Sequence, residues 1–170
     1  MSSSSWQAQV YAALKAARIT LLAYVPDAGH AHLIEAAHAD PDMRAVVLTT
    51  EEEGIAFAAG AWLGGQRAVL LMQSSGVGNT INMLSLTQGC RFPLLTLVSM
   101  RGEFGEGNPW QFAMGQAVEP VLKAMGVIVL RAEQPDDVIP CVTAALTMAF
   151  QSRQQVAVLL TQRLIGAKKF

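Results

Sequence analysis

Three consecutive acids followed by small and apolar residues form the segment best suited to chemistry in this chain. Glu51, Glu52 and Glu53 lead into residues 54–60, which are all glycine, alanine, isoleucine or phenylalanine. Acids in the first turn of a helix are favourable in any protein, because they face unpaired N–H groups and the positive end of the helix dipole. Taken alone, they indicate a solvated cap. An acid that such a helix carries into an apolar setting can instead share a proton with a ligand base, and Gly60 would let the helix pack closely against a neighbour.

A glycine-rich segment, residues 73–79, follows a short apolar run and reads Gln-Ser-Ser-Gly-Val-Gly-Asn. Glycines permit a tight turn, and the N–H groups at the start of a helix can hold an anion or a polar ring edge. The dinucleotide-binding fingerprint requires a glycine where this chain has Ile81, and the Gly-Lys-Ser/Thr of a phosphate loop does not occur. A binding loop and a purely structural turn both remain open.

A second glycine-rich segment, residues 101–111, is long and mixed in charge. Long loops in compact domains are often functional, which favours a binding loop. The alternative is a flexible surface loop that Trp110 anchors by packing down.

The histidines and serines give weaker signals. His30, His32 and His38 lie on or near one predicted helix, but the first two are two residues apart and so do not share a helical face. With no cluster of acids or cysteines beside them, capping or solvent-exposed histidines are expected. Ser74 and Ser75 lack an evident His/Asp partner and a nucleophile-elbow sequence, which argues against serine hydrolysis.

Short apolar runs alternate with longer periodic segments along the whole chain. The pattern predicts strands over 19–25, 45–49, 68–72, 93–100, 127–130 and 156–160, and helices over 5–18, 28–39, 51–63, 79–89, 115–125 and 135–151. Unbroken apolar strands separated by helices are typical of a parallel sheet covered on both faces. We therefore expect an α/β, doubly wound, six-stranded and mostly parallel sheet in one domain spanning residues 1–170. In such sheets ligands bind where loops leave the carboxyl ends of strands.

Composition narrows the class of protein. The chain has 170 residues, of which 52% are hydrophobic and 15% charged, with a net charge of −1. The absence of a basic run argues against a nucleic-acid partner, and no apolar stretch is long enough for a membrane span. Two cysteines and a start unlike a signal peptide predict a cytoplasmic location. So few charges indicate that part of the surface is buried against other subunits.

Read in order, three features together resemble one family. They are Glu51 with Gly60, residues 72–79, and residues 101–107 with Gln111 and the Met-Gly pair at 114–115. This combination is similar to the thiamine-diphosphate-dependent 2-oxo acid decarboxylases. Within them it resembles the alpha subunit of sulfopyruvate decarboxylase and the N-terminal part of phosphonopyruvate decarboxylase. The resemblance covers nearly the whole chain.

The resemblance implies a cofactor site. Glu51 would be the catalytic acid, hydrogen-bonding the pyrimidine N1′ of thiamine diphosphate and starting the proton transfers that let the cofactor attack the keto carbon. Gln73, Ser75, Gly76 and Asn79 would border the pyrimidine.

It also implies a substrate pocket formed by Ser74, Arg101, Trp110 and Gln111. Arg101 is the candidate partner of a sulfonate or phosphonate, although a structural loop arginine is equally consistent with the sequence. Two differences from the family pattern affect which substrate is expected. The family usually has asparagine where this chain has Ser74, and Trp110 places a large ring where a small residue is expected. Sulfopyruvate is the best match, with phosphonopyruvate or a bulkier 2-oxo acid as alternatives.

In the family, the diphosphate and Mg²⁺ are held by a second domain with a Gly-Asp-Gly segment and a downstream asparagine. No Gly-Asp-Gly occurs in this chain. The resemblance therefore implies a beta-type partner subunit and a hetero-oligomer with at least two copies of each chain. A non-catalytic partner or regulatory module of the same fold is the alternative from another functional class.

Overall fold

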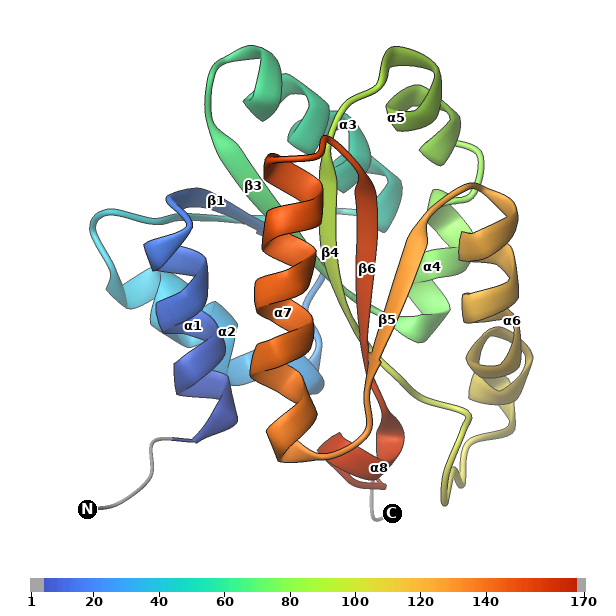
Figure 1. Ribbon diagram of the computed structural model, residues 1–170. Coiled ribbons are helices and arrows are strands. Elements are labelled where there is room, and N and C mark those ends of the chain that lie inside the picture. The colour runs from blue at the N-terminus through green and yellow to red at the C-terminus, as the bar shows by residue number, and fades with distance from the viewer. Residues whose placement is uncertain (1–4, 168–170) are drawn as a thin grey trace.

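The computed structural model describes residues 5–167 and contains one six-stranded sheet (Figure 1). Every neighbouring pair of strands is parallel, in the order β2-β1-β3-β4-β6-β5. The strands are β1 (Ile19–Tyr24), β2 (Arg44–Val47), β3 (Arg67–Gln73), β4 (Leu94–Ser99), β5 (Ile128–Ala132) and β6 (Gln155–Leu160). The predicted α/β architecture is confirmed, and the sheet is parallel throughout.

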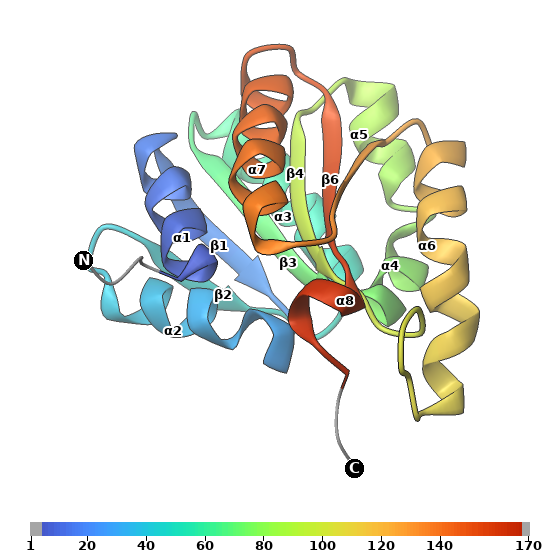
Figure 2. The ribbon, with the colours of Figure 1, turned by 60° about the horizontal axis from the view of Figure 1, so that its bottom comes forward.

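Helices cover both faces of the sheet (Figure 1). One face carries α1 (Trp6–Ala16), α2 (Ala31–Ala39) and α7 (Pro135–Phe150); the other carries α3 (Glu51–Leu63), α4 (Ser74–Thr80), α5 (Leu84–Cys90) and α6 (Phe112–Ala124). Three short elements complete the chain: η1 (Ala28–His30), η2 (Pro109–Gln111) and α8 (Gln162–Ile165). In Figure 2 the lower edge of Figure 1 comes forward, with α8 beside the carboxyl ends of the strands.

The core consists of two apolar layers, one on each side of the sheet. All residues of the central strands β4 and β6 are buried, which explains why their sequences are continuously apolar rather than alternating. The buried hydroxyls of β4 are hydrogen-bonded: Thr96 donates to the carbonyl of Leu70 at 2.9 Å, and Ser99 donates to Asp27. No helix within residues 5–167 is long and apolar enough to cross a membrane.

The segment after β3 differs from the prediction. Residues 73–79 were expected to form a loop leading into one helix over 79–89, but α4 begins at Ser74 and α5 is a separate helix. Gly76 and Gly78 lie inside α4, where they allow close packing rather than a turn: a Cβ on Gly78 would lie 3.2 Å from the sulfur of Met114. Helix α6 likewise begins at Phe112 instead of at residue 115.

Candidate active site at the carboxyl edge of the sheet

Glu51 is the one acid of the first turn of α3 that enters the interior. Its exposed fraction is 8%, whereas Glu52 and Glu53 are exposed. Glu53 turns back toward the helix start and accepts a hydrogen bond from the backbone N–H of Thr49 at 2.9 Å. The solvated-cap interpretation therefore describes Glu53, while Glu51 occupies a different environment.

Helix α4 lies directly on the Glu51 carboxyl group. A Cβ placed on Gly76 would lie 2.2 Å from Oε1 of Glu51, so only glycine leaves room for this carboxyl. Asn79, one turn further along α4, donates from Nδ2 to Oε2 of Glu51 at 2.8 Å. Residues three apart share a helical face, so α4 presents one small residue and one amide to the acid. Of the two oxygens of the Glu51 carboxyl, only Oε2 accepts a hydrogen bond from a described residue. Oε1 is therefore available to a ligand.

The expected close approach at Gly60 is wrong. A Cβ on Gly60 would have no atom within 4 Å, because this residue faces outward. Gly54 is the glycine that brings α3 onto the sheet, since its Cβ would lie 2.4 Å from Cδ1 of Leu70.

A chain of side-chain hydrogen bonds runs along the same edge. Oε1 of Gln73 accepts from Oγ of Ser75 and from Nε2 of Gln111, both at 3.0 Å. Nε2 of Gln73 donates to Oδ1 of Asp27 at 3.0 Å. Gln111 is buried, and its Oε1 has no hydrogen-bond partner among residues 5–167. The fold thus brings together three of the residues that the sequence predicted for the site.

Asp27 was not among the predicted site residues; it lies between the predicted strand 19–25 and the predicted helix 28–39. It caps η1, accepting from the N–H of Gly29 at 3.1 Å, and the same oxygen also accepts from the hydroxyl of Ser99. The available signal was its position in the loop that follows β1, at the edge where the other candidate loops lie.

Ser74 is fully buried and hydrogen-bonds the backbone of Arg101 instead of facing open space. Its hydroxyl accepts from the N–H of Arg101 at 3.0 Å and donates to the carbonyl of the same residue at 3.4 Å. This link ties the start of α4 to the segment that follows β4.

Arg101 is held by Glu106 in a two-pronged ion pair. Nε and Nη2 each lie 2.6 Å from a carboxylate oxygen, and the side chains of Arg101 and Glu106 are only 13% and 1% exposed. Hydrogen bonds from Arg101 lower the pKa of Glu106 to about 2, and the same contact raises the pKa of Arg101. Nε2 of Gln162 donates to Glu106 at 3.0 Å, fastening the loop to α8. The guanidinium is therefore largely committed within the loop.

The rest of this loop packs tightly on α6 but leaves its aromatic residues outside. Gly102 has φ +77°, and a Cβ on Gly115 would lie 2.2 Å from the carbonyl of Arg101. Trp110 is 81% exposed, Phe104 47% and Phe112 45%. The structure thus does not show Trp110 packed down as an anchor or beside Glu51.

The expectation of capping or exposed histidines is wrong for His30. It is 1% exposed, its Nε2 lies 3.2 Å from the carbonyl of Met72, and burial lowers its pKa. The neutral imidazole is thereby favoured. His32 and His38 are exposed, as expected, although His38 also contacts the hydroxyl of Tyr24 at 2.8 Å.

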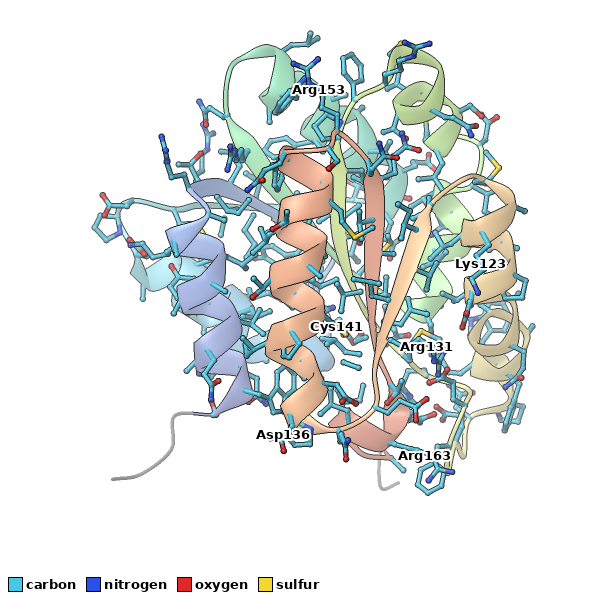
Figure 3. All side chains as sticks on the ribbon, in the orientation of Figure 1. Lys123, Arg131, Asp136, Cys141, Arg153 and Arg163 are labelled. Atoms are coloured by element: carbon cyan, nitrogen blue, oxygen red, sulfur yellow. The ribbon has the colours of Figure 1, made fainter. Side chains whose placement is uncertain are left out.

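A separate pocket of ≈ 540 Å³ lies between β5, α6 and α8, and Lys123, Arg131 and Arg163 border it (Figure 3). Arg131 pairs there with Glu103 at 2.7 Å and Glu119 at 3.2 Å. The residues that line this pocket do not include Glu51, Gln73 or Gln111. We therefore place the candidate site at Glu51 rather than in this pocket.

Comparison with known proteins identifies the family. Residues 5–125 match the model of the thiamine pyrophosphate enzyme, N-terminal TPP binding domain. Sulfopyruvate decarboxylase subunit alpha of Methanococcus maripaludis is 32% identical over 89% of this chain and 91% of the relative. The protein of the same name from Methanothermobacter thermautotrophicus is 34% identical over 89% and 92%. Phosphonopyruvate decarboxylase of Streptomyces viridochromogenes is 37% identical over 68% of this chain but 30% of the relative.

Among solved structures, 2-oxoglutarate:ferredoxin oxidoreductase from Magnetococcus marinus matches with a TM-score of 0.76 at 16% identity, covering 95% of this chain and 29% of that one. At that identity the match shows the fold alone. Within residues 5–167, one carboxyl oxygen of Glu51 and Oε1 of the buried Gln111 accept no hydrogen bond, so both are available to hydrogen-bond donors of a ligand ring. The chain belongs to the thiamine pyrophosphate enzymes, as an N-terminal, pyrimidine-binding domain of that family.

Proposed function

We propose that this chain is the pyrimidine-binding subunit of a two-chain decarboxylase that uses thiamine diphosphate. The reaction is the conversion of a 2-oxo acid and a proton to an aldehyde and CO₂. The observation that carries the proposal is the buried carboxyl of Glu51, with a glycine and an asparagine of α4 packed against it. The names of the relatives support decarboxylation, with sulfopyruvate as the first substrate to test and phosphonopyruvate or a bulkier acid as alternatives.

The residues of this chain would hold and orient the reacting groups. When bound, thiamine diphosphate supplies the electron sink that accepts the electrons of the bond to CO₂. Glu51 holds a proton between its Oε1 and a ring nitrogen, while Asn79 fixes the carboxyl through Oε2. Gln73, Ser75 and Gly76 border the ring from the start of α4.

The diphosphate and Mg²⁺ are assigned to a partner chain. This sequence has no Gly-Asp-Gly segment, and the relatives that match over most of their length are named subunit alpha. We therefore infer a beta-type partner that carries Gly-Asp-Gly and a downstream asparagine. The assembly would contain at least two copies of each chain.

Arg101, the candidate partner of an acidic substrate tail, is already paired with Glu106. Glu106 takes the Nε and Nη2 donors of Arg101, so a sulfonate can use only the remaining N–H groups of Arg101, beside a negative carboxylate. A second cation from the partner would then complete a pocket for sulfopyruvate. Trp110 and Gln111 are the candidates for the rest of that pocket.

The role of Glu51 is tested in the enzyme reconstituted with its partner. Glu51→Gln should lower decarboxylation at least about 10²-fold, as loss of an acid–base group does, without preventing assembly. Glu52→Gln is the matched control, because it removes the same charge from an exposed neighbour. A fully active Glu51→Gln enzyme, or an equal loss at Glu52, would disprove the assignment.

The substrate is tested with a panel of 2-oxo acids. If Arg101 binds the tail, Arg101→Ala should raise KM for sulfopyruvate about ten- to a hundredfold more than KM for pyruvate. A wild-type preference for aromatic-tailed acids, unchanged in Arg101→Ala but lost in Trp110→Ala, would reject the anion pocket and leave decarboxylation standing. The thermal midpoint of each variant separates a binding defect from loss of the loop.

A further inference from the structure

Asp27 lies at one end of the series of side-chain hydrogen bonds at the carboxyl edge of the sheet. Its Oδ2 accepts from the N–H of Gly29 at 3.1 Å and from the hydroxyl of Ser99, and its Oδ1 accepts from Nε2 of Gln73 at 3.0 Å. An ionised carboxylate can only accept hydrogen bonds. The amide group of Gln73 must therefore point its nitrogen at Asp27 and its oxygen away.

The same constraint passes to the next side chain. The Gln73 oxygen faces Gln111 at 3.0 Å, so Gln111 must point its own amide nitrogen toward Gln73. The oxygen of Gln111 is then left on the far side, where it is buried and has no partner in the described part of the chain. Ser75 does not break this order, because its rotatable hydroxyl can donate or accept.

We infer that Asp27 is a positioning residue, which fixes Gln73 and through it Gln111 so that the site presents an acceptor, Oε1 of Gln111, to a ligand N–H or O–H donor. A buried acceptor without a partner is destabilising, and a ligand donor would satisfy it. The identity of the ligand rests on the proposed function; the orientation of the amides does not.

Under the proposed function, two ligand groups have the required chemistry. The 2-oxo carboxylate group that reacts carries no N–H or O–H donor at neutral pH. The acceptor therefore meets either the amino group of the cofactor or the hydroxyl that forms when the keto oxygen of the substrate takes up a proton. Both are donors, and the tests below separate them.

Asp27→Asn is predicted to reverse the donor and acceptor roles in both hydrogen bonds that link residue 27, Gln73 and Gln111. The Gly29 N–H still requires an oxygen on its side of residue 27, so the new amide nitrogen faces Gln73. Gln73 then turns its oxygen toward residue 27, and Gln111 turns its oxygen toward Gln73. The site now presents the nitrogen of Gln111, a donor, where the wild type presents an acceptor.

The reversal is measured by NMR on the full chain with labelled glutamine side chains. In the wild type, the Gln73 amide protons should show nuclear Overhauser contacts to the β-protons of residue 27. In Asp27→Asn they should instead contact Ser75. The exposed Asp136→Asn is the matched control and should leave the wild-type pattern. Unchanged contacts in a folded Asp27→Asn chain would overturn the inference.

Gln73→Met supplies a second test, because it removes the connection between residues 27 and 111. In that background, Asp27→Asn should no longer alter the Gln111 amide signals. An equal effect with and without Gln73 would show that Asp27 does not act through this chain of amides.

The ligand is then identified in the reconstituted enzyme. When the Gln111 donor faces a donor of the ligand, the Kd or the kcat should worsen about ten- to a hundredfold. A rise of that size in the Kd of thiamine diphosphate for Asp27→Asn assigns the cofactor amino group, whereas an equal fall in kcat with unchanged Kd assigns the substrate hydroxyl. If the NMR reversal occurs and neither constant changes, the acceptor role of Gln111 is rejected. If the wild-type assembly is inactive, the proposed function fails while the NMR result stands.

Discussion

Gly76→Ala should inactivate the enzyme by moving Glu51, with little effect on the fold. The added Cβ would lie 2.2 Å from Oε1, 2.3 Å from Cδ and 2.6 Å from Cγ of Glu51, whereas ordinary contacts begin near 3.4 Å. The carboxyl must therefore shift by about 1 Å, and a misplacement of this size at a reacting group can cost about 10²-fold in rate. We expect that loss in kcat/KM for the reconstituted decarboxylase.

Gly60→Ala is the matched control for this prediction. It makes the same change in the neighbouring helix, where the new Cβ meets nothing within 4 Å. Alanine is favoured over glycine inside a helix by about 0.5–1 kcal/mol, so Gly60→Ala should raise the thermal midpoint and leave activity unchanged. At Gly76 the same gain is offset by overpacking of about 1–3 kcal/mol. A Gly76→Ala enzyme with wild-type kcat/KM would refute the claim that the position of Glu51 matters.

Three further predictions concern the loop and the assembly. The pKa of Glu106 is lowered from 4.5 to about 2, so the stability that its carboxylate contributes is complete above pH 4.5 and is lost as the pH falls toward 2. The difference in thermal midpoint between wild type and Glu106→Gln should therefore shrink over that pH range. Arg101→Ala leaves Glu106 buried without its cation and should destabilise the chain by about 3 kcal/mol in denaturant unfolding, whereas Arg101→Lys should cost less; equal stability of all three chains would contradict this. Calorimetry with Mg²⁺ should show weak binding of thiamine diphosphate to the isolated chain, and tight stoichiometric binding without a partner would reject the split site.

Most of the fold could be predicted from the residues because its elements have strong local signals. The strands are short apolar runs, and Glu51–Leu63 was predicted with its observed bounds. The segment after β3 was not predictable in the same way. Gly76 and Gly78 favour a turn by local preference, and only packing against Glu51 and Met114 explains why they lie inside a helix.

The candidate site, like the fold, was predictable from the sequence only in part. The sequence by itself determined that three polar segments follow parallel strands, and parallel strands end at one edge of a sheet. It also singled out Glu51 through its resemblance to a family. The sequence did not determine which carboxyl is buried, or that Glu106 holds Arg101, because both depend on which helix or loop packs against them.

The tertiary structure alone decided the polarity of the site. Asp27, Gln73 and Gln111 are far apart in sequence, and each amide can point either way in isolation. Their order is set because the fold places an acceptor-only carboxylate at one end of the chain of amides. Contacts between distant residues carry this information, and no local pattern of residues contains it.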